Sequence, residues 1–132
     1  MSKLATFWTG DLSAGFPSSH NIEVLNDGTP TRKGMLKKIE NLLSAKWGGV
    51  TVSRVRGIWW EDENTCIREW GYKFEVYFHL SSYSTLDWVE ELRADARFIA
   101  CLLKQKEVHL TIADVILLEV QPEYTGPSRM GA

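Results

Sequence analysis

The sequence predicts an α+β domain in which two helices cover one face of a small antiparallel sheet. Two patterns support this: apolar residues recur at helical spacing over about 31–46 and 85–104, and apolar and polar residues alternate over 66–80. The chain has 132 residues, of which 44% are hydrophobic and 24% charged, as is typical of one folded domain. We expect a single domain over 1–121 and a flexible tail over 122–132.

The first predicted elements are a strand and a helix. Residues 4–9 are rich in β-branched and aromatic types, which favour a strand. A long connection of Gly, Ser, Pro and Asn follows over 10–30, and loops of that length are often functional. We expect the first helix over 31–46, with Thr31 as its cap and the Gly48-Gly49 pair at its end.

The second half of the chain predicts a hairpin, a helix and a last strand. One hairpin arm covers 50–60, the turn 61–64 and the other arm 66–80. The first arm alternates less strictly, which indicates a bulge near 53–55. The second helix is expected over 85–104, with Ser84 and Asp87 forming a capping box, and the last strand over 108–120.

The resulting order is β-α-β-β-α-β. Each helix is amphipathic on one side only, so both should cover the same sheet. With right-handed crossovers, this order gives a ferredoxin-like sandwich whose antiparallel sheet has one face open.

The second half also resembles a small, uncharacterised bacterial family of ferredoxin-like proteins. That family has a G-x-T-V, G-x-W, R-E and Q-x-x-V pattern. The matching residues, within 48–120, are Gly49, Thr51, Val52, Gly57, Trp59, Arg68, Glu69, Gln105 and Val108. The resemblance implies the fold and no particular activity.

Composition excludes several classes of function. The net charge of −2 and the isoelectric point near 5.9 argue against nucleic-acid binding, although residues 70–77 partly match the aromatic pattern of RNA-recognition domains. The sequence has neither a signal-peptide pattern nor a membrane-spanning apolar run, so a cytoplasmic protein without membrane contact is expected. Cys66 and Cys101 have no metal-ligand spacing, and we expect neither a metal nor a cofactor.

Three histidines suggest one candidate catalytic site. We expect His79 at the end of the third strand and His109 at the start of the fourth, on either side of the end of the first strand, where Asp11 lies. The long loop that carries His20 leaves from the same edge. Histidine titrates near neutral pH and serves as an acid or a base, so this group would suit a small ligand.

The uncovered sheet face is a second candidate site, for a ligand or for self-association. Trp59 and Trp60 are adjacent, so one of them should point to this face. The residues expected at this surface are Arg54, Arg56, Trp59, Trp60, Glu69, Lys73, Glu75 and Tyr77.

The sequence leaves two functions open. The first is a small binding or interaction protein that forms a homodimer through the open sheet face. The alternative is a small-molecule enzyme of the dimeric α/β type with a histidine-lined site at the sheet edge, so whether the chain is an enzyme stays undecided.

Overall fold

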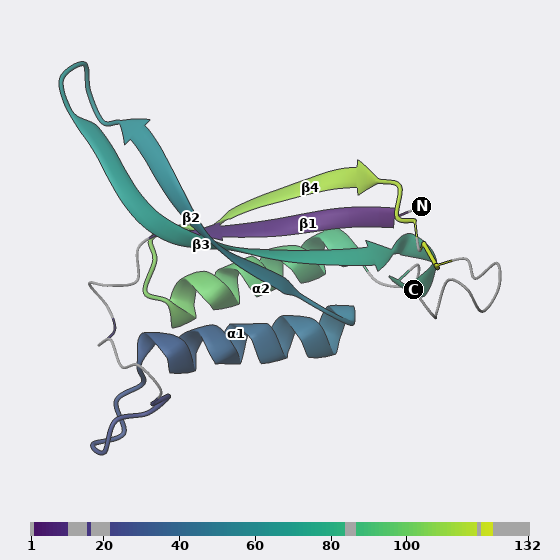
Figure 1. Cartoon of the computed structure of the whole chain (residues 1–132), viewed down its shortest axis with the longest axis horizontal. Helices are drawn as coiled ribbons and strands as arrows, with labels where there is room; N and C mark the ends of the chain where they lie inside the picture. Colours follow the sequence, from purple (N-terminus) through teal and green to yellow (C-terminus); the bar gives the residue numbers. More distant parts are fainter. Residues whose placement is uncertain (1, 11–15, 17–21, 84–86, 119, 123–132) are drawn as a thin grey trace, which may run out of the picture.

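The computed structural model describes residues 2–10, 16, 22–83, 87–118 and 120–122. Its elements are listed in chain order: β1 (Ser2–Thr9), α1 (Arg32–Trp47), β2 (Thr51–Trp60), β3 (Cys66–His79), a 3₁₀ turn (Leu80–Tyr83), α2 (Trp88–Leu102) and β4 (His109–Val115). Apart from the added turn, this is the predicted order, as Figure 1 shows.

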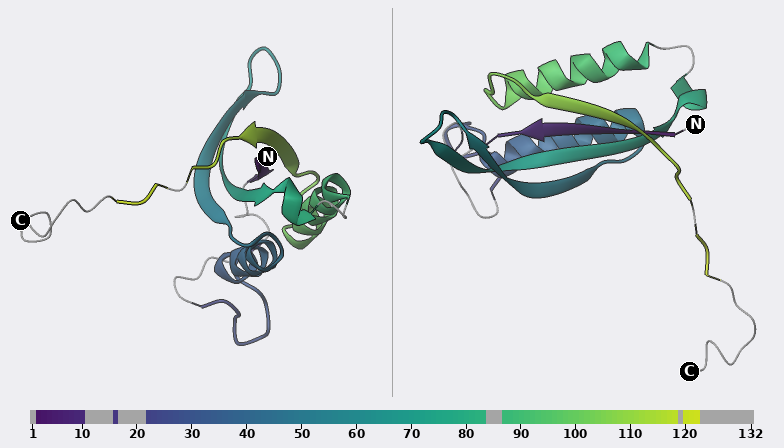
Figure 2. Two further views of the ribbon diagram at one scale, coloured as in Figure 1. Left: turned by 90° about the vertical axis from the view of Figure 1, so that its right-hand side faces the viewer. Right: turned by 90° about the horizontal axis from the view of Figure 1, so that it is seen from above.

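The four strands form one antiparallel sheet in the order β2-β3-β1-β4. Both helices lie against the same face of this sheet (Figures 1 and 2). The predicted ferredoxin-like α+β fold is therefore confirmed.

The core lies between the sheet and the helices. Phe7 and Phe74 pair across β1 and β3 and are fully buried, as are Ile39 and Leu43 of α1 and Ile99 of α2. Aromatic contacts extend this core to the end of the sheet, where the Trp47 and Phe78 ring centroids lie 4.8 Å apart. The predicted apolar stripes of the two helices supply its second layer.

Side-chain caps fix the helix ends. The Thr31 hydroxyl oxygen accepts from the Gly34 amide at 3.2 Å and donates to the Ile22 carbonyl at 2.6 Å, as expected of an N-cap. For α2 the cap is Asp87, whose carboxylate accepts from the Glu90 amide at 3.2 Å. The predicted cap, Ser84, lies outside the described residues.

A buried acid joins the two helices. Asp95 of α2 is buried and accepts from the Trp47 indole at 2.8 Å and from Lys46 Nζ at 2.9 Å. Burial alone would lower the pKa of Lys46, but its hydrogen bonds to Glu91 and Asp95 outweigh that effect and raise the pKa. This contact holds the end of α1 against α2.

The β2–β3 hairpin is regular, so the predicted bulge is wrong. Its register is unbroken from Thr51 opposite Glu75 to Trp60 opposite Cys66. The outer half of the hairpin rises away from the rest of the sheet and beyond the helices (Figure 1). At its tip the Asp62 carboxylate accepts from the Asn64 and Thr65 amides, both at 2.8 Å, which closes the turn.

A close approach of backbones marks the point where the hairpin leaves the sheet. At Gly71, a Cβ atom would lie 2.1 Å from the Thr9 carbonyl oxygen. Only glycine fits this approach, because a side-chain carbon cannot sit so near a backbone oxygen. The backbone of β3 can therefore lie unusually close to the end of β1.

The last strand is shorter than predicted. β4 ends at Val115, and the chain continues away from the body in an extended path (Figure 2). Ile116, Leu118 and Val120 are exposed there and pack on no core element. The predicted strand over 108–120 is thus a short edge strand followed by a projecting segment.

Candidate functional site

The sheet register separates the histidines that the sequence analysis grouped. His79 lies opposite Ser2 at the start of β1, whereas His109 lies opposite Trp8 near its end. Six residues of strand at ~3.3 Å per residue place them about 20 Å apart. The predicted cluster of His79 with His109 is therefore wrong, because β3 runs antiparallel to β1 and ends where β1 begins.

The structure describes two of the four members of that cluster, His79 and His109. His20 and Asp11 lie outside the described residues. The side chain of His79 contacts the Ser2 hydroxyl, 3.1 Å from Nδ1. Of the two described members, His109 stays at the predicted edge, where β1 ends and β4 begins.

That edge holds a hollow of about 770 Å³. Its walls come from the end of β1, the bend in β3, the loop after α2 and the start of β4. The lining residues are Trp8, Thr9, Gly10, Glu69, Lys104, Gln105, Lys106, Glu107 and His109. Its size is within the usual range for small-molecule sites.

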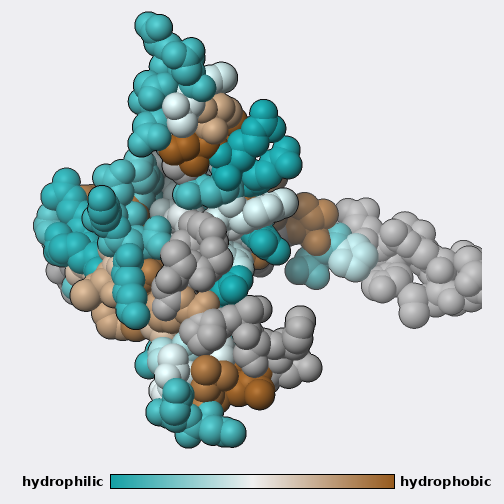
Figure 3. Space-filling model, turned by 90° about the vertical axis from the view of Figure 1, so that its left-hand side faces the viewer, coloured by the Kyte–Doolittle hydropathy of each residue, from teal (hydrophilic) through white to brown (hydrophobic). Residues whose placement is uncertain are grey.

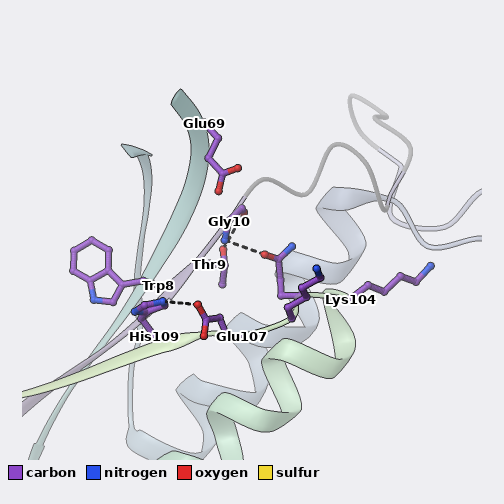
Figure 4. Close-up of a pocket in the computed structure, with 9 residues that line it drawn as sticks. Trp8, Thr9, Gly10, Glu69, Lys104, Glu107 and His109 are labelled. Atoms are coloured by element: carbon purple, nitrogen blue, oxygen red, sulfur yellow. Dashed lines mark hydrogen bonds and ion pairs between the residues drawn. The ribbon is translucent and has the colours of Figure 1, made fainter. Parts of the chain in front are cut away.

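Gly10 lies between Glu69 and the loop after α2, as Figure 4 shows. Its amide donates to Gln105 Oε1 at 3.2 Å. A Cβ atom on Gly10 would lie 2.9 Å from both Gln105 Oε1 and Glu69 Oε1, so the two oxygens approach the backbone here from opposite elements. The bend at Gly71 brings Glu69 to this position.

The remaining walls combine an aromatic ring with charged groups. The Trp8 indole donates to Thr111 Oγ1 at 3.1 Å, and Lys73 Nζ lies 5.7 Å from its ring centroid. His109 Nε2 lies 3.1 Å from Glu107 Oε1, and both side chains are well exposed. The pocket therefore offers an indole, an imidazole, two carboxylates, two lysine side chains and a side-chain amide.

Two residues assigned to the open sheet face lie on the other face. Because the hairpin register is unbroken, Arg54 and Arg56 share a side with Tyr72 and Trp70, which they face across the strands. A bulge would have reversed this parity, and none is present. Arg54 and Arg56 lie over the Trp70 ring, with 4.7 Å and 6.0 Å from the guanidinium carbons to the centroid.

The rest of the predicted face is only partly on the open side. Lys73, Glu75 and Tyr77 are on the open face, where Lys73 and Glu75 form an ion pair at 3.3 Å. Glu69 shares their side and reaches the pocket. Trp60 lies on the opposite side with Arg56 and is two-thirds exposed, at 66%. For Trp59 only the backbone is described, opposite Ile67.

Within the described residues, no group of three or more His, Cys, Asp or Glu side chains could hold a metal ion. Cys66 and Cys101 are free there. In the same part of the chain, no helix has the length and apolar character needed to cross a membrane.

By sequence, the chain matches no protein-family model and no curated protein. Its structure is similar to that of a phage SAM lyase in the apo state, with a TM-score of 0.55, 16% identity, and coverage of 84% of this chain and 78% of the lyase. A phage SAM lyase in complex with S-methyl-5'-thioadenosine gives a TM-score of 0.51 at 12% identity, covering 86% and 81%. CutA from Synechococcus elongatus PCC7942 gives 0.49 at 8% identity, covering 87% and 77%.

At such identities, the likeness to the lyase structures shows a shared fold. This shared fold agrees with the ferredoxin-like fold that the sequence pattern of residues 48–120 implies.

Sequence reasoning missed most of the pocket. Trp8, Gln105 and Glu107 were not candidates for a site, although Gln105 belongs to the family pattern. The sequence did hold a signal for this pocket, because it predicts that the end of the first strand and the start of the fourth lie side by side. The missing step was to add the loop that joins the second helix to the fourth strand.

Proposed function

We propose that this chain is a small-molecule enzyme that binds S-adenosylmethionine in the pocket at the end of β1 and cleaves it, releasing S-methyl-5'-thioadenosine. The observation that carries the proposal is the pocket itself, lined by Trp8, Glu69 and Glu107. It occurs in a fold similar to that of a lyase whose named ligand is this thioadenosine.

The pocket suits the parts of this ligand. An adenine ring is flat and aromatic, and the ring of Trp8 offers a stacking surface. The amino-acid end carries an ammonium, for which Glu69 provides the opposite charge. The ribose hydroxyls need hydrogen-bonding groups such as the Gln105 amide and the Glu107 carboxylate.

The proposed reaction needs little from the protein in proton transfer. When the bond between sulfur and the amino-acid chain breaks, its electron pair goes to sulfur, and the sulfonium becomes a neutral thioether. The carbon released can be taken by the substrate's own carboxylate, which closes a five-membered lactone. No atom or proton is gained or lost, so the enzyme mainly has to hold the two ends in line.

Charge balance assigns the role of Glu69. The positive charge on sulfur disappears during cleavage, so a carboxylate placed beside sulfur would stabilise the substrate more than the transition state. The ammonium keeps its charge throughout. We therefore assign Glu69 to the ammonium, where it can anchor the chain without slowing the reaction.

Turnover of S-adenosylmethionine tests the proposal. The purified protein is incubated with it, and S-methyl-5'-thioadenosine is measured by liquid chromatography. We expect product from the wild type and, at substrate concentrations well below KM, at least a hundredfold less from Glu69→Gln, about 2.7 kcal/mol in kcat/KM through weaker substrate binding. Glu63→Gln changes an exposed acid at the hairpin tip and is the matched control, expected to keep full activity. Equal product from both variants, or none from the wild type, contradicts the proposal.

Self-association through the open sheet face, as a homodimer, is a second candidate. Tyr77 and Trp8 are exposed large side chains on that face, and both helices lie on the other one. In sizing chromatography with light scattering, Tyr77→Glu should shift such a dimer to the monomer. A wild type that stays monomeric, or an unaffected Tyr77→Glu dimer, would exclude this interface. The most exposed apolar side chains, however, lie away from that face.

A further inference from the structure

We infer that this chain assembles by strand addition, with the segment after β4 of one copy lying along the free edge of β2 of a second copy. The segment, here called the arm, consists of the described residues 116–118 and 120–122. This inference concerns a surface away from the pocket and does not depend on the proposed activity.

The arm is built like a strand that lacks its partner. Ile116, Leu118 and Val120 are 88%, 76% and 84% exposed. The arm runs outward from the body (Figure 2). Leu117, between Ile116 and Leu118, is also apolar and 44% exposed, so the arm is an extended run rich in apolar side chains on both of its faces, as in a strand that needs a partner. An exposed apolar run of this kind marks an interaction site.

The free edge of β2 is a suitable acceptor. Among the described strands, β2 is the outermost on its side of the sheet, and it spans ten residues, Thr51–Trp60. Its outward amide and carbonyl groups are not used by β3, so they can pair with an added strand. Ile58 and Trp60 are 50% and 66% exposed on one side of β2, where they could cover the arm's apolar side chains. In Figure 3 apolar surface gathers on the hairpin, bordered by hydrophilic residues.

The arm cannot reach this edge within its own chain. β4, from which it continues, is the opposite edge strand, with β1 and β3 between. Three strand spacings of ~4.8 Å separate the two edges, and the arm points away from the sheet. A second copy provides the same edge without this constraint.

Charge also favours a second copy. In the sequence, residues 116–122 contain one charged residue, the acidic Glu119. β2 contains two charged residues, the basic Arg54 and Arg56, so the arm and the acceptor strand carry opposite charges. Both arginines are exposed. Because arm and acceptor are different surfaces, the contact is head to tail, and repeated contacts of this kind close into a ring when the rotation allows.

Crosslinking of two variants tests this inference. In a chain with Cys66→Ser and Cys101→Ser, one preparation carries Leu118→Cys and another Ile58→Cys. The two are mixed and treated with a short bismaleimide. We expect a covalent dimer in the mixture and only monomer in each preparation alone. A dimer from Leu118→Cys alone would mean that arms pair with arms, and no dimer in the mixture would mean that β2 is not the acceptor; either overturns the inference.

Light scattering gives an independent measurement on the otherwise unchanged chain. The wild type should be oligomeric, and Leu118→Asp should be monomeric with unchanged circular dichroism. Phe98→Asp is the matched control, because Phe98 is a 47% exposed apolar residue that belongs to α2 and to neither the arm nor β2. A monomeric wild type, or a Leu118→Asp variant as oligomeric as Phe98→Asp, overturns the inference.

Discussion

Replacing Gly71 by alanine tests how the pocket is assembled. The new Cβ would lie 2.1 Å from the Thr9 carbonyl oxygen, whereas real contacts of this kind stay above 3.0 Å. The two strands would have to separate by about 0.9 Å, since neither atom belongs to a flexible side chain. Gly71 is next to the Thr9–Tyr72 pair, so the shift also weakens hydrogen bonds between β1 and β3.

The cost can be estimated from these two effects. Overpacking of a dense region costs about 1–3 kcal/mol, and a weakened ladder hydrogen bond adds about 1 kcal/mol. We expect Gly71→Ala to lose about 3 kcal/mol of unfolding free energy, or about 10 °C in Tm for a chain of this length. Because β3 also carries Glu69, the variant should lose activity in the surviving folded fraction.

Thermal unfolding followed by circular dichroism measures this loss. Gly49→Ala is the matched control, because a Cβ at Gly49 meets nothing within 4 Å and its φ is not in the left-handed region. Gly49→Ala should unfold within about 2 °C of the wild type, since surface changes without a special contact cost little. Equal Tm values for the two variants would refute the close approach of β3 to β1.

Three further predictions concern the rest of the fold. Asp95→Ala should cost about 3 kcal/mol in urea unfolding, because it removes a buried carboxylate that Trp47 and Lys46 contact, and a loss under 1 kcal/mol would contradict that role. Thr31→Ala should cost about 1 kcal/mol through loss of the α1 cap, and an unchanged urea midpoint would show that the cap contributes nothing. Hydrogen bonds from the Asn64 amide and from Thr65 lower the pKa of Asp62 below 3.8. The ionised Asp62 should therefore stabilise the hairpin turn fully above pH 3.8, and this stabilisation should be lost as the pH falls through the pKa of Asp62 in the folded protein. An NMR titration that gives Asp62 a pKa at or above 3.8 would contradict this.

The fold was predictable because its signals are local and repeated. Met35, Ile39 and Leu43 recur at helical spacing, and Phe74, Val76 and Phe78 alternate along β3, so each pattern identified its element and its buried side. The one-sided helices then left a single layered arrangement. Amphipathic periodicity thus decided the architecture without any motif.

The site was less predictable because it depends on strand direction and register. The histidine hypothesis required β1 and β3 to end at the same edge, whereas antiparallel pairing places His79 and His109 at opposite ends of β1. The placement of Arg54 and Arg56 depended on a bulge, and a shift of one residue reverses every side chain of a strand. The pocket itself depends on long-range contacts, such as that of Gly10 with Gln105, which local patterns do not encode.

The location of the ligand is tested most directly by adding S-methyl-5'-thioadenosine to ¹⁵N-labelled protein and recording two-dimensional NMR spectra. We predict that the Gly10 amide and the Trp8 indole signals shift in a saturable manner, and that the Glu69→Gln variant keeps this response, because the thioadenosine lacks the ammonium to which Glu69 is assigned. Shifts confined to the smaller hollow beside Gly28 and Lys37, or no shifts at all, would contradict a ligand site at the end of β1.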